Sequence, residues 1–160
     1  MLCVAALLVL TTACGSSAAK AKDATTADVY TAVLKHLVTA PVNPDDKQVV
    51  YVAPFANQKA IPLETQVDVI AGLADVATVR FVDELSEAVD DGSPGSPAKG
   101  AEVVLLGPMV VTGPITEVEA QHYGSETDQV RYRFRVSSTA DGAWSAQQVE
   151  AVEVPPTTSA

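Results

Sequence analysis

The sequence predicts an α+β domain in which two N-terminal helices pack on a mainly antiparallel, curved sheet that ends in a C-terminal β-meander. Apolar residues recur at helical spacing in two segments before residue 76. From residue 101 onward, runs of β-branched and aromatic residues alternate with turn residues, a pattern typical of strands. Helices therefore come first and strands dominate later, which favours an α+β fold.

The first helix is predicted to begin after Thr25, because Thr25 and Asp28 have the spacing of a capping box. Its apolar stripe consists of Tyr30, Val33, Leu34, Leu37 and Val38. Pro41 ends the helix, since proline cannot donate a backbone hydrogen bond. Residues 48–53 are rich in β-branched and aromatic side chains and predict a buried strand.

A loop over residues 54–61 is expected to lead into a second helix, which starts at Pro62 and runs to about Asp75. One side of this helix carries Leu63, Val67, Ile70 and Ala74. A second strand is predicted over residues 78–82, and a short acidic turn of helix over residues 83–90. Residues 91–100 are rich in glycine, serine and proline and predict a loop.

The meander is predicted to begin with the apolar residues 102–106 and 109–111. Gly107-Pro108 interrupts this run, which argues for a bulge or an edge position. The later strands are expected over residues 115–123, 129–137 and 144–154, with turns at 112–114, 124–128 and Asp141-Gly142. Residues 25–154 therefore predict a single domain, and residues 155–160 a disordered tail.

The N-terminus predicts an export signal over residues 1–13. Its apolar run is too short to cross a bilayer, which takes about 20 apolar residues. The segment Thr11-Thr12-Ala13-Cys14 resembles a bacterial lipobox. That resemblance implies transfer of diacylglycerol to the sulfur of Cys14 and cleavage before it. An ordinary secretory signal with an incidental cysteine, or an apolar N-terminus that is never cleaved, are the alternatives.

Cys14 is the only thiol left after such processing, because Cys3 lies inside the apolar run. The mature part is thus predicted to hold no disulfide and no thiolate metal site. Two acyl chains on one cysteine give stable membrane anchoring. Residues 14–24 combine the lipidated cysteine with small and polar residues that predict a flexible tether. The expected location is the extracytoplasmic face of the cell membrane.

The net charge of -10 argues against two classes of partner. From Thr25 onward the chain has 8 basic and 19 acidic residues, and that field repels nucleic acid and anionic lipid head groups. No nucleic-acid partner is therefore expected. Membrane attachment must come from the lipid on Cys14 and not from a basic patch.

Arg131, Arg133 and Arg135 are the candidate ligand-binding residues, since alternation along a strand puts them on one face. Such a row could bind carboxylate or phosphate groups. If residues 124–128 close a hairpin, however, Glu119 falls opposite Arg133, Glu117 opposite Arg135 and Gln121 opposite Arg131. Opposite charges across strands stabilise a sheet, so the favoured interpretation is a solvated salt-bridge ladder.

No catalytic residue, metal site or cofactor is predicted. The sequence has two histidines, His36 and His122, and neither has a sequence neighbour at metal-ligand spacing. The carboxylates of residues 83–91 lack the spacing of a calcium loop. The motif Gly-x-Ser-x-Gly, the P-loop and the dinucleotide glycine fingerprint are absent from the sequence.

Two resemblances concern the domain. The residues that carry the first are Val104-Leu105-Leu106-Gly107-Pro108, Val118, Tyr123, Arg131-Tyr132 and Asp141-Gly142-Ala143-Trp144. With these the chain resembles uncharacterised exported proteins of actinobacteria, which implies no activity. Helices followed by a curved meander also resemble the cystatin-like or NTF2-like architecture, and this analogy concerns the fold alone.

The sequence thus predicts a membrane-anchored lipoprotein of the cell envelope with a small binding or interaction domain and an envelope protein as partner. An envelope hydrolase that uses His122 with a nearby carboxylate is the competing enzyme hypothesis, and a structural accessory subunit without its own ligand is the third. A deep pocket where His122, Tyr123 or the arginines meet carboxylates would favour the enzyme. A flat, ladder-paired sheet would count against the enzyme and the anion site.

Labelled palmitate tests the anchor. We expect the label on the wild-type protein and on Cys3→Ser, and none on Cys14→Ser, because only the thiol at residue 14 is predicted to carry acyl chains. The measurement is radioactivity or fluorescence in the immunoprecipitated protein. Label that survives in Cys14→Ser would contradict lipidation at this position.

Overall fold

The computed structural model describes residues 25–38, 47–56, 58–90, 93–98, 100–113 and 115–153. The predicted signal, Cys14, the tether, Pro41 and the predicted tail lie outside these residues. Within the described part, neither helix has the length and apolarity that a membrane span requires.

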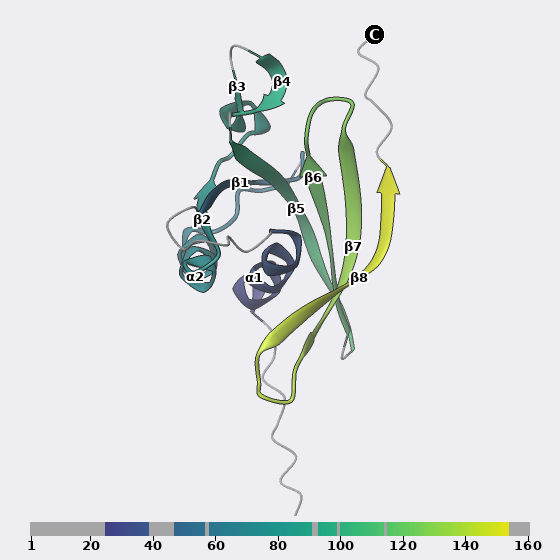
Figure 1. Ribbon diagram of the computed structural model, residues 1–160. Coiled ribbons are helices and arrows are strands. Elements are labelled where there is room, and N and C mark those ends of the chain that lie inside the picture. The colour runs from purple at the N-terminus through teal and green to yellow at the C-terminus, as the bar shows by residue number, and fades with distance from the viewer. Residues whose placement is uncertain are drawn as a thin grey trace, which may run out of the picture.

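The elements in chain order are α1 (Thr26–Leu37), β1 (Gln48–Pro54), α2 (Leu63–Leu73), β2 (Ala77–Phe81), the 3-10 helix η1 (Leu85–Ala88), β3 (Val89–Asp90), β4 (Ser93–Pro97), β5 (Ala101–Thr112), β6 (Ile115–Tyr123), β7 (Gln129–Ser138) and β8 (Trp144–Glu153). Six strands form one sheet in the order β2-β1-β5-β6-β7-β8. Figure 1 shows both helices on the same side of this sheet. The predicted α+β class, with two helices and a C-terminal meander, is confirmed.

The sheet joins a parallel half to an antiparallel half. β1 pairs in parallel with both β2 and β5, whereas β5 to β8 pair as antiparallel neighbours. Parallel neighbours need a crossover, and α2 supplies it between β1 and β2. Nothing in the sequence pattern had predicted this parallel pairing, because it joins strands that are distant along the chain.

α1 begins with the predicted capping box. The backbone N–H of Asp28 donates to Oγ1 of Thr25 at 3.1 Å, and the backbone N–H of Thr25 donates to Oδ2 of Asp28 at 3.0 Å. The helix ends at Leu37, ahead of Pro41. Its buried side is broader than the predicted stripe, since Ala27, Val29 and Ala32 are buried as well.

The main core lies between the helices and one face of the sheet, which we call the helix face. Its fully buried large side chains are Val29, Val33, Leu34, Val50, Val52, Val69, Leu73, Val104, Leu106, Val118 and Phe134. The opposite surface, the open face, is covered only at one end. There η1, β3 and β4 lie over a smaller cluster that contains Ala88, Val103 and Tyr123.

α2 presents the predicted apolar side to solvent. Leu63, Val67 and Ile70 are 71%, 56% and 42% exposed. The helix packs instead through Val69 and Leu73, which are fully buried on its other side. Gly72 allows α2 to approach α1 closely, because a Cβ at this position would lie 2.8 Å from Cγ2 of Thr31 on α1. The helix also ends at Leu73, two residues before the predicted end.

Residues 83–98 contain more structure than predicted. The acidic helical turn shrinks to η1, where the carboxylate of Glu87 accepts hydrogen bonds from the backbone N–H groups of Asp83 and Glu84. The predicted loop contains β4, which pairs antiparallel with β3. The phenolic O–H of Tyr123 donates to the backbone oxygen of Gly95 at 3.0 Å and ties this hairpin to the sheet.

β5 contains the predicted bulge. Its register with β6 shifts between Leu106 and Met109, yet the strand continues on both sides of Gly107-Pro108. β5 is an inner strand, so the bulge and not the edge position is the correct alternative. A Cβ at Gly107 would lie 2.9 Å from the backbone oxygen of Glu119, which explains why glycine stands there.

The rest of the meander follows the prediction closely. β6 has the predicted bounds, and β7 ends one residue later than predicted. The turn at Asp141-Gly142 is longer than a two-residue hairpin, because the backbone N–H of Thr139 donates to the oxygen of Ala143 and closes a loop over residues 139–143. β8, the edge strand, has a register shift that leaves Val149 as an extra residue opposite β7.

We expect Gly107→Ala to lower the free energy of unfolding by about 1–3 kcal/mol, because overpacking forces backbone shifts. The new methyl group would meet the backbone oxygen of Glu119 and, at 3.0 Å, the ring of Phe55. Chemical denaturation measures the loss. Gly113→Asn is the control, since Gly113 has open space and a φ of 60° that asparagine tolerates. An equal loss in both variants would contradict the steric explanation.

Candidate functional site

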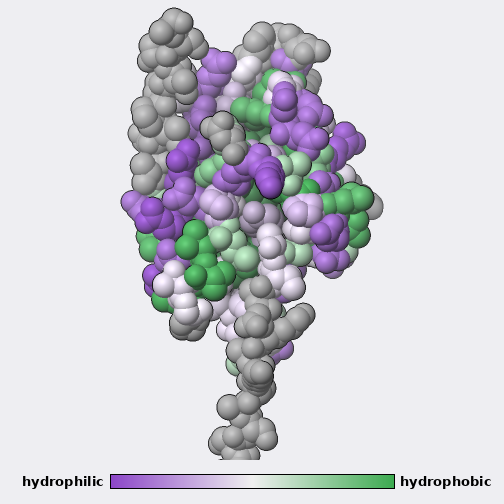
Figure 2. Space-filling model, turned by 180° about the vertical axis from the view of Figure 1, so that it is seen from behind, coloured by the Kyte–Doolittle hydropathy of each residue, from purple (hydrophilic) through white to green (hydrophobic). Residues whose placement is uncertain are grey.

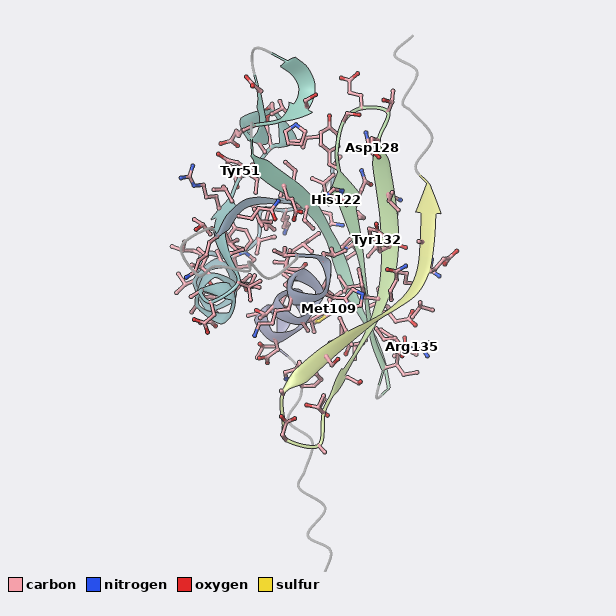
Figure 3. All side chains as sticks on the ribbon, in the orientation of Figure 1. Tyr51, Met109, His122, Asp128, Tyr132 and Arg135 are labelled. Atoms are coloured by element: carbon pink, nitrogen blue, oxygen red, sulfur yellow. The ribbon has the colours of Figure 1, made fainter. Side chains whose placement is uncertain are left out.

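The three predicted arginines project from β7 on the open face. Their cross-strand partners are those predicted: Gln121 pairs with Arg131, Glu119 with Arg133 and Glu117 with Arg135. Figure 3 shows Arg135 on the side of the sheet away from α1, whereas Met109 lies on the side of α1. The open face is therefore the one candidate ligand surface that the sequence analysis identified.

Arg133 and Arg135 are held by carboxylates. Nη2 of Arg133 lies 3.4 Å from Oε1 of Glu119 and its Nη1 lies 3.1 Å from Oε2 of Glu150 on β8. Nη2 of Arg135 lies 3.1 Å from Oε1 of Glu117. These side chains are 36–49% exposed, so each pair contributes at most about 1 kcal/mol. The salt-bridge ladder is confirmed for these two positions.

Arg131 has a different environment. Its Nη2 donates to Oε1 of Gln121 at 3.2 Å, and its guanidinium lies over the ring of Phe55, 5.0 Å from the centroid. Gln121 is only 5% exposed, and its side-chain amide also donates to Oε1 of Gln129 at 2.7 Å. Among the described residues, no carboxylate pairs with Arg131. Anion binding by the three arginines remains a prediction, and only Arg131 keeps its charge uncompensated.

Shallow depressions accompany the ladder. One, of about 350 Å³, lies between Pro108, Val110, Glu117 and Arg133. A second, of about 200 Å³, lies between Arg131, Arg133 and Glu150. A larger groove of about 430 Å³ runs on the helix side, where Asp28 and Lys35 of α1, Asp68 of α2 and Trp144 line it. None of these three hollows is lined by His122.

The two histidines lie on different elements, His36 on α1 and His122 on β6. The ring of His36 contacts Phe134 edge to face, with the centroids 5.3 Å apart. His122 stands on β6 opposite Val104 and Val130. In the part of the chain that the structure describes, no hydrogen bond or ion pair joins either histidine to a carboxylate, and no group of three or more His, Cys, Asp or Glu residues is placed to hold a metal ion.

Two tyrosines and one aspartate have perturbed acidities. Burial raises the pKa of Tyr30 and of Tyr123, and for Tyr123 the charge of Glu126 adds to the effect. Both phenols therefore stay protonated at neutral pH, and both donate to backbone oxygens, those of Gly107 and Gly95. The hydroxyl of Thr139 and nearby backbone N–H groups lower the pKa of Asp141. These tyrosines are structural donors.

Sequence reasoning missed two features. The exposed apolar side of α2 could have been recognised from the sequence. Val69 and Leu73 lie opposite Leu63 and Val67, so the helix is apolar on two sides, and a helix that buries only one of them leaves the other exposed. No sequence pattern indicates the stacking of Arg131 on Phe55, since the two residues are distant along the chain.

Comparison of the chain with models of protein families, with curated proteins and with solved structures found no match.

The variants Arg133→Met and Arg131→Met compare the stability contributed by an arginine in the salt-bridge ladder with that contributed by an arginine without a paired carboxylate. We expect Arg133→Met to lose about 1 kcal/mol of unfolding free energy at low salt, and most of this loss to vanish in 1 M salt, where the Debye length is about 3 Å. Arg131→Met has no paired carboxylate, so its loss should depend less on salt. Denaturation curves at two salt concentrations measure both. The same salt dependence for the two variants would contradict the pairing described above.

Proposed function

We propose that this chain is a lipid-anchored, exported protein of the cell envelope whose domain binds a partner protein through the outer side of α2. The lipid is attached at Cys14. The partner carries an apolar groove bordered by lysine or arginine. The observation that carries the proposal is the exposed apolar side of α2, which we call the α2 stripe: Leu63, Val67, Ile70, Ala71 and Ala74.

The α2 stripe has the geometry of a helix that docks in a groove. Leu63, Val67 and Ile70 follow the spacing i, i+4, i+7, which places them on one side of the helix. At 3.6 residues per turn, the five residues of the stripe fall within roughly 100° around the axis. Val69 and Leu73 already bury the other side. The fold does not use the stripe, so it is available to a partner.

The charges next to the α2 stripe favour a basic partner. Glu64 and Asp68 are exposed and follow the stripe around the helix, and α2 itself contains no lysine or arginine. One cation, Lys47, stands at the C-terminal end of the stripe, where its Nζ donates to the backbone oxygen of Ala74. Complementary charges at the rim of an apolar contact speed encounter and exclude wrong partners. A second copy of the chain would bring the acidic rims together. An anionic membrane would repel them as well.

Neither the hydrolase with His122 nor the accessory subunit is favoured by a specific contact. Both stay predictions, and no second function is proposed.

A photo-crosslinking residue at Val67 in the anchored protein tests this surface, with the same residue at Val149 as control. Val149 is 50% exposed on β8 and lies outside α2. We expect the probe at residue 67 to yield one protein adduct that the probe at residue 149 does not yield. Mass spectrometry then identifies the adduct, so that the partner can be purified.

The variant Leu63→Ser/Val67→Ser/Ile70→Ser should weaken binding of that purified partner by about tenfold or more, because anchors of this kind dominate interface energetics. Its melting temperature should stay close to wild type, since the side chains are exposed. Val149→Ser should bind like wild type. An adduct that consists of lipid or of a second copy of this chain, or undiminished binding by the triple variant, would end the proposal.

A further inference from the structure

Three parts of the domain meet at one of its ends. The turn between β5 and β6 and the turn over residues 139–143 lie at the same end of the meander, because the strands alternate in direction. The start of α1 is there too, since Thr25 and Asp28 line one groove together with Gly142. Figure 1 shows the two turns and the start of α1 at the lower end of the domain. The described chain therefore begins at this end.

The end of the β5–β6 hairpin is apolar on both sides. Val110, Val111 and Ile115 are 54%, 60% and 37% exposed, and residues 109–116 contain no charged residue. Val110 lies on the open face, where it lines a depression with Arg133, and alternation turns Val111 the other way. Figure 2 shows a green, hydrophobic area toward the lower end of the molecule, besides other green areas at the right edge and near the top.

We propose that the end of the β5–β6 hairpin dips into the lipid surface to which the chain is anchored. The inference rests on the lipid anchor of the proposed function. Cys14 precedes Thr25 by 11 residues, so the segment can reach at most about 36–40 Å. Because the chain enters the domain at the same end as the hairpin, that end lies nearest the membrane.

A lipid phase fits this hairpin better than a protein does. A protein partner covers one side of a hairpin, whereas the aliphatic side chains here point to both sides, which suits an apolar medium that surrounds the tip. The tip has no lysine or arginine, so the contact depends on apolar burial and does not need anionic head groups. The anchor keeps the tip at high local concentration near the bilayer, so a weak contact suffices.

Charged residues near the hairpin end limit how deeply it can enter the lipid. Asp141 on the adjacent turn is fully exposed and ionised at neutral pH, which keeps that turn in water or among the head groups. The opposite end of the meander carries Glu126 and Asp128 on the β6–β7 turn, and both are exposed. The hairpin end beyond the Val110–Glu117 pair is thus the uncharged part of the membrane-proximal end.

Tryptophan quenching by brominated phosphatidylcholine tests the contact. The reporters Val111→Trp and Ile115→Trp are each placed in the full-length protein with Trp144→Phe, isolated with its lipid and reconstituted in vesicles of phosphatidylcholine. Glu126→Trp, at the other end, is the matched control. We expect quenching at residues 111 and 115 to exceed that at residue 126 about twofold or more, because only inserted side chains approach the bromines. Val111→Asp, with the reporter at residue 115, should abolish the difference.

A failure of the hairpin contact can be distinguished from a failure of the lipid anchor. If mass spectrometry shows no lipid on the isolated protein, the full chain with Cys3→Ser is coupled through Cys14 to a maleimide lipid and measured in the same vesicles. Stronger quenching at residue 111 would then support the hairpin contact although the native anchor had failed. Equal quenching at residues 111, 115 and 126, or stronger quenching at residue 126, would overturn the inference in either preparation.

Discussion

The packing of α1 across β5 is the contact on which the other parts of the structure depend. Among the described strands, β5 is the one with a parallel partner, β1, on one side and an antiparallel partner, β6, on the other. Val33 and Leu34 of α1 are fully buried in the cluster that also contains Val104 and Leu106. The hydroxyl of Tyr30 donates to the backbone oxygen of Gly107 at 3.0 Å, so the helix is fixed at the bulge itself.

This arrangement decides what the two faces of the sheet can do. Both helices occupy the helix face, and the strands of the open face must therefore satisfy their side chains among themselves or with water. The meander does so with carboxylates on β6 and β8 on either side of Arg133. Such a surface is solvated and carries the two depressions that lie along the ladder. The large apolar side chains that remain exposed lie on the outer side of α2, at the end of the β5–β6 hairpin and, in the case of Val149, on β8.

Local patterns in the sequence predicted the parts of the fold that local chemistry determines. The capping box at Thr25, the bulge at Gly107 and the register of β6 against β7 each depend on neighbouring residues or on one turn length. The side of α2 that is buried depends on contact with α1 through Gly72. The pairing of β1 with β5 joins distant segments in the same way. Periodicity carries no information on such contacts.

The contacts of the three candidate ligand-binding arginines also differ in whether the sequence could predict them. The partners on β6, Glu119 for Arg133 and Glu117 for Arg135, follow from the hairpin register and could be predicted. The second partner of Arg133, Glu150 on β8, was not predicted. The stacking of Arg131 on Phe55 could not be predicted, because the loop after β1 approaches β7 only in the folded chain.

The extra residue in β8 has a consequence for neighbouring molecules. β8 is one edge of the sheet and β2 is the other, and an edge strand offers unpaired backbone groups to any second strand that approaches. At Val149 the regular spacing of those groups is interrupted, and Glu150 stands beside the interruption, held by Arg133. An irregular edge of this kind hinders a second strand from extending the sheet across β8.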